Sequence, residues 1–306
     1  MAEISSQNDD SRKTLSSTVL QPQEFDSSLR LTGSPLEATL RHIRHPLFVM
    51  SGKGGVGKSA VTVNLAVALA NKGYSVGILD VDMHGPSIPS LLGLDAHLAA
   101  QGDAVISPVL YKNAIRVVSM DSLLENRDTA VIWRGPKKTA AIRQFLSGVA
   151  WGKLDYLLID SPPGTGDEHL AVLQAIPHAR CIMVTTPQEI SLADVRKAIH
   201  FLRRVKANLL GLVENMSGLS CPYCGGSIDL FSSGGGERLA LERNIPFLGR
   251  IPVDPAMLVA ADQKIPVVDL PVDTAAKEAF EHLAVAVQKS CAEYYVFSNN
   301  NAANVN

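Results

Sequence analysis

A glycine-rich stretch carries the first residues whose types and spacing could do chemistry. It lies between the apolar run 47–50 and an apolar segment with helical periodicity, 59–71. Glycines let consecutive backbone N–H groups converge on phosphate oxygens, and the N-terminus of a following helix favours negative charge. A lysine then adds a full charge, and a hydroxyl is a ligand for Mg²⁺. Four residues fit the pattern G-x-x-x-x-G-K-[ST]: Gly52, Gly57, Lys58 and Ser59.

The stretch therefore predicts a phosphate-binding loop that holds ATP with Mg²⁺. Lys58 is expected to act on the phosphates during hydrolysis. A second lysine, Lys53, follows the first glycine, although the pattern does not need it to hold the phosphates of its own nucleotide. The residues expected to bind the nucleotide through this loop are Gly52, Lys53, Gly54, Gly55, Val56, Gly57, Lys58, Ser59 and Ala60.

Carboxylates follow two further apolar runs. Asp80 and Asp82 end one run, and Asp160 ends another. Because the C-terminal ends of parallel strands line the ligand crevice, these acids should lie near the loop. Asp80, Asp160 and Ser59 are predicted to bind Mg²⁺ or its bound water. Asp82 is predicted to orient a water for attack on the γ-phosphate. For the first two acids, capping of the next helix is the alternative. The Pro-Pro-Gly-Thr-Gly sequence at 162–166 suits a switch loop.

Short aliphatic runs alternate with helical segments along most of the chain, which predicts a mostly parallel sheet flanked by helices, an α/β fold. A C-capping glycine, Gly73, should end the helix after the loop. A capping-box pattern should start another helix at Ser191, which runs to about Lys206. The expected strands are 47–50, 76–79, 115–119, 156–159, 181–185, 209–214 and 247–251, with a lead-in helix at 36–44, Pro46 as the entry to the first strand, and a last helix from Thr274 to about Ala292.

Composition and charge indicate a cytoplasmic protein without a membrane span. Hydrophobic residues make up 46% of the 306 residues, charged residues 19%, and the formal charge is −2. No apolar run approaches the ~20 residues that span a bilayer, the N-terminus lacks a signal-peptide pattern, and nothing in the net charge attracts nucleic acid. The expected organisation is one ATPase domain, 41–297, between a disordered polar tail, 1–40, and a disordered tail, 298–306.

Two of the four cysteines are spaced to share a metal. Cys221 and Cys224 flank Pro-Tyr and precede two glycines, so the pair supplies half of a four-thiolate site. Two subunits that contribute one pair each would complete it. Such a site could hold an iron–sulfur cluster. The alternatives are zinc in the same four-thiolate site and a thioredoxin-like redox pair. Cys181, in an expected strand, and Cys291, in the last helix, are interpreted as structural thiols.

Taken together, the motifs resemble the Mrp/ApbC family of iron–sulfur cluster carrier ATPases, within the MinD/ParA-like superfamily of deviant Walker A P-loop NTPases. The resemblance covers about Pro46 to Leu283. The motifs that carry it are Gly-Lys-Gly-Gly-Val-Gly-Lys-Ser at 52–59, Asp-x-Asp-x-x-Gly-Pro-Ser at 80–87, Trp-Arg-Gly-Pro at 133–136, Asp-Ser-Pro-Pro-Gly-Thr-Gly-Asp at 160–167, Glu-Asn-Met-Ser at 214–217 and Cys-Pro-Tyr-Cys-Gly at 221–225.

The resemblance implies a homodimer that binds a [4Fe–4S] cluster between its subunits and transfers it to apoproteins, with slow ATP hydrolysis. It implies that Lys53 contacts the nucleotide of the partner subunit, that Asn215 reads the adenine edge, and that Asp82 lies in switch I. Asp160 would be the Walker B acid. Because the first 45 residues contain no cysteine, a short-form carrier without an N-terminal cluster motif is expected.

Two other classes of ATPase remain open. A positioning or partition ATPase uses a similar loop but needs a basic amphipathic helix or a basic surface, and residues 291–297 contain no lysine or arginine. The cluster Arg203, Arg204 and Lys206 is interpreted as a solvated helix face. A reductase of the nitrogenase iron-protein type would need a cysteine beside the Walker B switch, and residues 160–170 contain none.

Overall fold

The computed structural model describes residues 34–82, 85–94, 100–101, 105–112, 114–120, 135–220, 224, 226–228 and 232–303. Most of the expected N-terminal tail, together with Trp133, Arg134 and Cys221, lies outside the described residues. All elements below belong to one compact unit that begins at Thr32.

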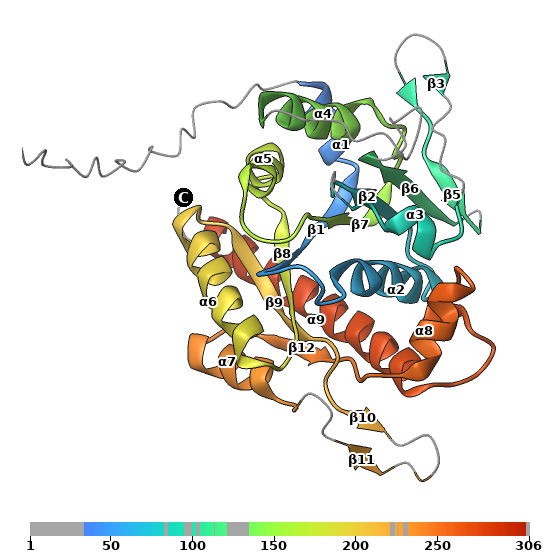
Figure 1. Ribbon diagram of the computed structural model, residues 1–306. Coiled ribbons are helices and arrows are strands. Elements are labelled where there is room, and N and C mark those ends of the chain that lie inside the picture. The colour runs from blue at the N-terminus through green and yellow to red at the C-terminus, as the bar shows by residue number, and fades with distance from the viewer. Residues whose placement is uncertain are drawn as a thin grey trace, which may run out of the picture. The chain divides into compact units, whose positions relative to one another are not determined.

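The strands of the sheet and its hairpins alternate with helices along the chain (Figure 1). The strands are β1 (Ile43–Ser51), β2 (Val76–Asp80), β3 (Ala100–Gln101), β4 (Val105–Ile106), β5 (Val109–Tyr111), β6 (Ile115–Ser119), β7 (Leu154–Asp160), β8 (Arg180–Thr185), β9 (Asn208–Glu214), β10 (Leu219–Ser220), β11 (Ser227–Ile228) and β12 (Phe247–Arg250). The helices are α1 (Pro35–Leu40), α2 (Lys58–Asn71), α3 (Ile88–Leu91), α4 (Gly135–Gly148), α5 (Asp167–Ala175), α6 (Glu189–Arg204), α7 (Gly235–Arg243), α8 (Pro255–Asp262), the 3₁₀ turn η2 (Val267–Asp269) and α9 (Ala275–Ala303).

Eight strands form one sheet in the order β12-β9-β8-β1-β7-β2-β6-β5. Each neighbouring pair is parallel except β5 and β6. The predicted α/β fold is therefore confirmed, and each expected strand is present with its ends shifted by at most a few residues. Only β3, β4, β5 and the β10–β11 hairpin were not expected, because each has just two or three residues.

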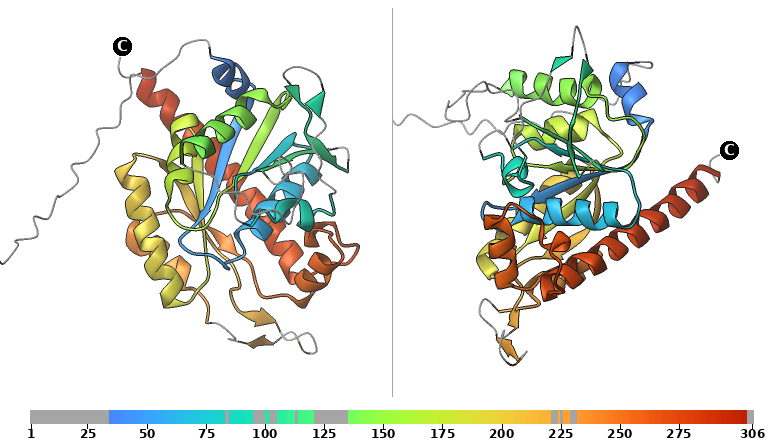
Figure 2. Two further views of the ribbon diagram at one scale, coloured as in Figure 1. Left: turned by 45° about the horizontal axis from the view of Figure 1, so that its top comes forward. Right: turned by 90° about the vertical axis from the view of Figure 1, so that its right-hand side faces the viewer.

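Helices cover both faces of the sheet, as Figure 2 shows in two further views. Alternate residues of β1 contribute to two separate apolar clusters: Leu47 and Val49 pack with α2, α8 and α9, whereas Phe48 and Met50 pack with α4, α5 and α6. A strand that is buried on both faces explains why the sequence of β1 is apolar without alternation.

The first strand begins earlier than expected, at Ile43, so Pro46 lies inside β1 instead of at its entry. Pro46 pairs only with Leu157 of β7, because pairing with β8 starts one residue later, at Leu47. A proline has no N–H to donate, and a position with a neighbour on one side only can tolerate that loss. The lead-in helix is correspondingly short, Pro35–Leu40.

Two helix boundaries differ from the expectation. Helix α6 begins at Glu189 and not at Ser191, because the Ser191 hydroxyl bonds to Thr186 Oγ1 at 2.6 Å and so does not cap the helix. Helix α9 runs to Ala303, well past the expected end near Ala292, so residues 298–303 are helical. No glycine or proline interrupts residues 275–303, which leaves no residue that would end the helix early.

The end of α2 was predicted correctly. It stops at Asn71, and Gly73 has the left-handed conformation, with φ of 89°. Among the described helices, none is both long enough and apolar enough to cross a membrane.

Candidate functional site

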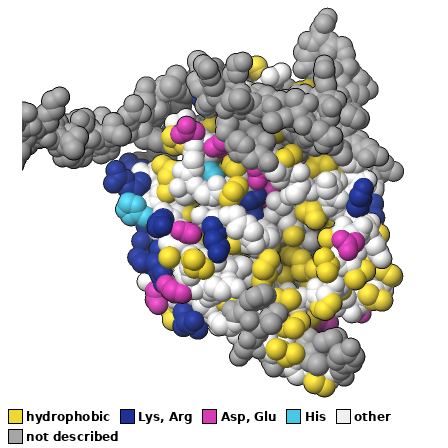
Figure 3. Space-filling model, viewed as in Figure 1, with side chains coloured by type: hydrophobic (Ala, Val, Ile, Leu, Met, Phe, Trp, Pro, Cys, Tyr) yellow, Lys and Arg dark blue, Asp and Glu magenta, His cyan; other side chains and the backbone are white. Residues whose placement is uncertain are grey.

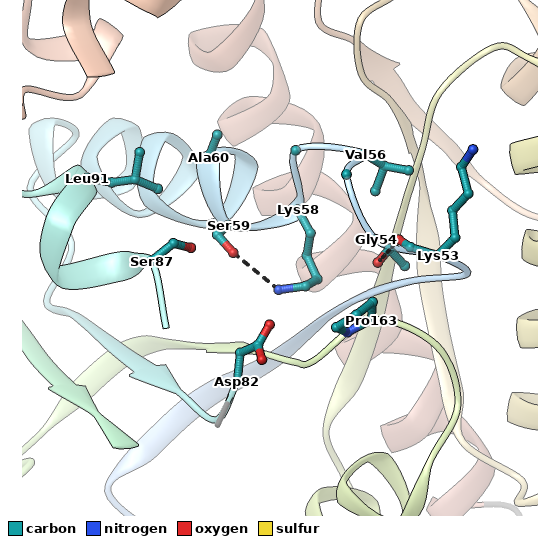
Figure 4. Close-up of a pocket in the computed structure, with 13 residues that line it drawn as sticks. Lys53, Gly54, Val56, Lys58, Ser59, Ala60, Asp82, Ser87, Leu91 and Pro163 are labelled. Carbon is teal, nitrogen blue, oxygen red and sulfur yellow. Dashed lines mark hydrogen bonds between the residues drawn. The ribbon is translucent and has the colours of Figure 1, made fainter. Parts of the chain in front are cut away.

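The glycine-rich loop connects β1 to α2 and lines a cavity of about 350 Å³ (Figure 4). Gly57 is the N-cap of α2 and has φ of 79°, which only glycine adopts without strain. The residues around the cavity are Ser51, Lys53, Gly54, Gly55, Val56, Gly57, Lys58, Ser59, Ala60, Asp82, Ser87, Leu91 and Pro163. All loop residues predicted to bind nucleotide except Gly52 therefore face this cavity.

Asp160 connects the loop to the end of β7. Its Oδ2 accepts hydrogen bonds from Lys58 Nζ at 2.7 Å and from Ser59 Oγ at 2.6 Å, and its Oδ1 accepts one from Thr62 Oγ1 at 2.7 Å. Lys58 and Asp160 are both buried. A buried ion pair is stable only if its remaining lone pairs and protons are satisfied, and here two hydroxyls supply the additional bonds. The sequence motifs at 52–59 and 160–167 thus meet at a single carboxylate.

Thr62 is part of this site although the sequence motifs did not indicate it. It lies one helical turn after Lys58, and its hydroxyl also donates to the Lys58 carbonyl at 3.0 Å. Because residues four apart share a helix face, the spacing from the loop lysine is the signal that would have found it.

The two acids after β2 have different environments. Asp80 is fully buried: its carboxylate accepts bonds from the Asp82 N–H at 3.0 Å, the Ser119 hydroxyl at 3.2 Å and the Ile88 N–H at 3.4 Å. Burial raises the pKa of Asp80 well above its usual value, and the charge of Asp160, its partner across the sheet, adds to the shift. Of the two, only Asp82 lines the cavity.

Asp80 therefore contacts the segment that carries Asp82, and its bond to Ile88 reaches the first residue of α3. This contact agrees with the alternative interpretation of Asp80, in which the acid caps the next helix. Asp82 in turn accepts a bond from the Gly85 N–H at 3.2 Å, so its carboxylate holds the turn before α3 while it faces the loop (Figure 4).

Lys53 and Gly52 differ from the rest of the loop. The Lys53 side chain extends away from Lys58 and Asp82 (Figure 4), and it forms no hydrogen bond or ion pair with any residue that the structure describes. A Cβ at Gly52 would lie 2.6 Å from the carbonyl carbon of Asp194 in α6. Gly52 is thus required by close packing against α6, and Lys53 projects from that packed turn.

Asn215 lies beneath the loop rather than in the cavity. It is 3% exposed, and its Nδ2 donates to the Val56 carbonyl at 2.8 Å. A side chain at Gly57 would collide with the same amide group. Asn215 therefore supports the loop, and its predicted contact with the adenine edge stays a prediction.

The donor set near the loop fits Mg²⁺, which prefers oxygen ligands and binds through one or two carboxylates together with substrate phosphates. The Ser59 hydroxyl lies 2.6 Å from the Asp160 carboxylate, and of the two residues Ser59 lines the cavity. In the described part of the chain, no group of three or more His, Cys, Asp or Glu side chains forms a ready metal cage. The nucleotide phosphates would have to supply the remaining ligands.

The cysteines occupy two kinds of environment. Cys181 and Cys291 are buried free thiols, and burial raises the pKa of Cys181 to about 12 and that of Cys291 above its usual value. Both positions suit the structural interpretation. Cys224 is an exposed free thiol between β10 and β11, whereas its predicted partner, Cys221, lies outside the described residues.

The sequence matches the ParA-type family of NUBPL iron-transfer P-loop NTPases over residues 42–288. The chain belongs to this family. An iron-sulfur cluster carrier protein from Methanocaldococcus jannaschii is 49% identical over 81% of this chain and 85% of that protein. The cytosolic Fe-S cluster assembly factor NUBP2 of Bos taurus is 52% identical over 71% of this chain and 82% of that protein.

Solved structures agree with this membership. A nucleotide-binding protein from Archaeoglobus fulgidus in complex with ADP is 41% identical, with a TM-score of 0.67 over 79% of this chain and 98% of that one. The cell division ATPase MinD of Pyrococcus furiosus is 25% identical, with a TM-score of 0.59 over 80% and 98%. The predicted MinD/ParA-like P-loop fold is thus confirmed, and the family implies hydrolysis of a nucleoside triphosphate.

Proposed function

We propose that this protein is an ATP-dependent iron–sulfur cluster carrier, which binds a cluster between two subunits and transfers it to apoproteins. The observation that carries the proposal is the exposed thiol of Cys224, one member of the Cys-x-x-Cys pair, between β10 and β11. This hairpin begins shortly after Asn215, the residue that supports the phosphate loop. Relatives named as cluster carriers or assembly factors, which this chain matches over more than four fifths of their length, support it.

ATP is the nucleotide substrate in this proposal. Lys58 donates a hydrogen bond to Asp160, and when ATP binds it would donate to phosphate oxygens instead. Ser59 and Asp160 would hold Mg²⁺, and Asp80 would support them from its paired position on the neighbouring strand. The metal ion, when bound, neutralises charge on the phosphates. Asp82 would orient the attacking water, a role supported by its position in the lining of the same cavity as the loop.

The proposal makes Lys53 a residue that acts on the partner subunit. Within one chain its side chain extends away from Lys58 and Asp82 and forms no hydrogen bond or ion pair with a described residue. A cation supplied across an interface can stabilise the charge that develops during phosphoryl transfer, as an arginine finger does. ATP hydrolysis would therefore require the dimer, which would make it slow in isolated chains.

Exposed apolar side chains support association with a second copy. Leu258 and Val259 of α8 and Ile228 of β11 are 68%, 51% and 42% exposed. Figure 3 shows apolar side chains gathered over α8 and near the β10–β11 hairpin, whereas lysines and arginines gather over α6 and α7. In such a dimer, Cys221 and Cys224 of each subunit would supply the four thiolates of a [4Fe–4S] cluster.

Anaerobic reconstitution tests the proposal. We expect one cluster per two chains, with iron and acid-labile sulfide in equal amounts and a holo-protein of dimeric mass. Cys221→Ser or Cys224→Ser should abolish cluster binding and transfer to an acceptor, while ATP binding persists. Cys291→Ala, which changes a buried thiol, is the matched control.

Zinc without acid-labile sulfide in the reconstituted protein would overturn the proposal in favour of a shared zinc site. A full cluster on a monomer would contradict the arrangement between two subunits while leaving the carrier function standing.

A further inference from the structure

Glu214, the last residue of β9, is a fully buried acid that the nucleotide site does not use. Its Oε1 accepts hydrogen bonds from the Ser217 hydroxyl at 2.5 Å and the Gly234 N–H at 2.7 Å, and its Oε2 accepts one from the Gly236 N–H. Hydrogen bonds that backbone N–H groups at a helix N-terminus donate to a carboxylate are stronger than those donated to a neutral acceptor. Glu214 thus anchors the start of α7.

Glycines allow this close approach. Gly234 is the N-cap of α7 and has φ of 76°. A Cβ at Gly236 would lie 2.9 Å from Leu212 and 3.0 Å from the Glu214 carboxylate. The segment after the cysteines is therefore glycine-rich at the point where it meets the acid.

The two bonds to Oε1 join distant parts of the chain. Ser217 precedes Cys221, and Gly234 follows Cys224, so one carboxylate oxygen holds together both ends of the segment that carries the cysteine pair. We call residues 217–234 the cysteine segment. Its ends are fixed at β9, while Cys224 between them is exposed.

The two residues between Glu214 and Ser217 contact the phosphate loop instead. Asn215 donates to the Val56 carbonyl, and the Met216 methyl group lies 3.7 Å from the position of a Cβ at Gly57. Met216 has φ of 55°, the left-handed conformation, which turns the chain sharply at this point. Within 214–217, Glu214 and Ser217 hold the cysteine segment, whereas Asn215 and Met216 contact the loop.

We infer that Glu214 is a positioning residue that couples nucleotide binding at the loop to the order of the two described ends of the cysteine segment, at 217–220 and 232–236. A shift of the loop at Val56 or Gly57 displaces Asn215 and Met216, and the bonds of Glu214 pass that displacement to both ends of the segment. Such coupling is reciprocal, so a ligand on the thiols would change nucleotide affinity by the same factor. The inference rests on the proposed function only for the identity of that ligand.

Hydrogen–deuterium exchange of the unloaded full-length protein tests the inference. In the wild type, a non-hydrolysable ATP analogue should change exchange of the amides at 217–220 and 232–236 by at least about fivefold, the low end of typical coupling. In Glu214→Gln those amides should exchange faster, and the nucleotide effect should fall below about twofold. The analogue should bind both proteins with similar affinity, because Glu214 does not line the cavity.

Two further variants separate positioning from general loss of structure. Asp155→Asn is the matched control, because Asp155 accepts bonds from the N–H and hydroxyl of Ser75, far along the sheet from the loop. It should retain the wild-type nucleotide effect. Ser217→Ala removes one bond and leaves the carboxylate on α7, so it should loosen residues 217–220 only. If Glu214→Gln does not fold, this variant decides the outcome.

The inference would be overturned by a wild-type nucleotide effect that survives in Glu214→Gln, by one that survives at residues 217–220 in Ser217→Ala, or by the absence of any effect in the wild type. Cluster loss to a chelator supplies a second readout: the reconstituted Glu214→Gln protein should lose its cluster several-fold faster than Asp155→Asn. If the wild type takes up no cluster, the proposed function fails, whereas the exchange experiment still decides the role of Glu214.

Discussion

The phosphate loop and the cysteine segment differ in how much of each site one chain builds. At the loop, side chains from α2 already bond to the end of β7, and Asp160 alone accepts three side-chain hydrogen bonds. In the cysteine segment the described thiol is exposed, the hairpin strands have two residues each, and the hydrogen bonds to Glu214 come from the two ends, Ser217 and Gly234.

This difference indicates which step a single chain can perform. A preorganised site loses little conformational entropy when it binds its ligand, so the nucleotide site should bind ATP in the monomer. In the proposed carrier, by contrast, a pair of thiolates is half of a cluster site, so the cluster would bind only when a second chain supplies another pair. Lys53 resembles Cys224 in this respect, because its side chain extends away from Lys58 and Asp82 and forms no hydrogen bond or ion pair with a described residue.

Lys53→Ala gives the largest expected effect. ATP should bind normally while hydrolysis falls by about 10³-fold, the low end of what a finger residue contributes. Steady-state ATPase assays and equilibrium binding measure the two quantities. Mixing this variant with Asp82→Ala should restore activity at one site of each mixed dimer, and proven mixing without rescue would show that Lys53 acts within its own chain.

Lys58→Ala would remove the preorganised pair with Asp160. ATP at 100 times its dissociation constant should stabilise the wild type by about 2.7 kcal/mol, and most of this stabilisation should vanish in the variant. Thermal unfolding with and without Mg²⁺-ATP measures it, with Lys72→Ala at the end of α2 as the control. Equal shifts in wild type and Lys58→Ala would contradict the nucleotide site itself.

His169 tests how tightly α5, the helix after the predicted switch loop at 162–166, packs against the sheet. It is fully buried in the first turn of α5, neither ring nitrogen has a described hydrogen-bond partner, and burial lowers its pKa to about 4. Since the unfolded chain then binds the proton more readily below pH 6.5, the neutral form stabilises the fold above that pH, and this stability is lost as pH falls toward 4.

Unfolding in denaturant at pH 7 and pH 5 measures this effect. His169→Phe should lose about 2 kcal/mol less than the wild type between the two pH values. His42→Phe, at an exposed position in the turn after α1, should behave like the wild type. An unchanged pH dependence in His169→Phe would mean that water reaches His169 easily in the wild type.

Thr62→Val has the smallest expected effect. It removes one of the hydrogen bonds to Asp160, leaves the cavity lining intact and should cost about 1 kcal/mol of unfolding free energy. Chemical denaturation measures it, and Thr39→Val, whose bond to Pro35 is exposed, is the control. A cost as small as that of the control would show that the Asp160 cluster is held by Lys58 and Ser59 alone.

The sequence was most informative where local pattern and function coincide. Apolar runs ending in acids predicted the sheet edge that carries Asp80, Asp82 and Asp160, because burial on both faces demands continuous apolar strands. It was least informative where contacts join distant segments. The Asp80 contact with Ile88 and the Asn215 contact with Val56 depend on packing that no local pattern encodes.

Helix ends show the same limit. Gly73 marked the end of α2 through its own backbone preference, whereas Ser191 looked like a cap and instead bonds to Thr186 because the preceding turn brings that hydroxyl within reach. The role of Glu214 was likewise not expected, since its partners are twenty or more residues away at Gly234 and Gly236.

Gly52 changes how mutations in the loop motif should be interpreted. The first glycine of the pattern is usually taken as part of the phosphate cradle, but here its hydrogen faces the backbone of α6, and it does not line the cavity. A substitution at this position would push α6 and the loop apart before any nucleotide arrived. Loss of ATP binding in such a mutant would therefore report on helix packing. Gly54 lines the cavity, and a Cβ there would meet only Pro163 at 3.9 Å, so its substitution examines the cradle more directly.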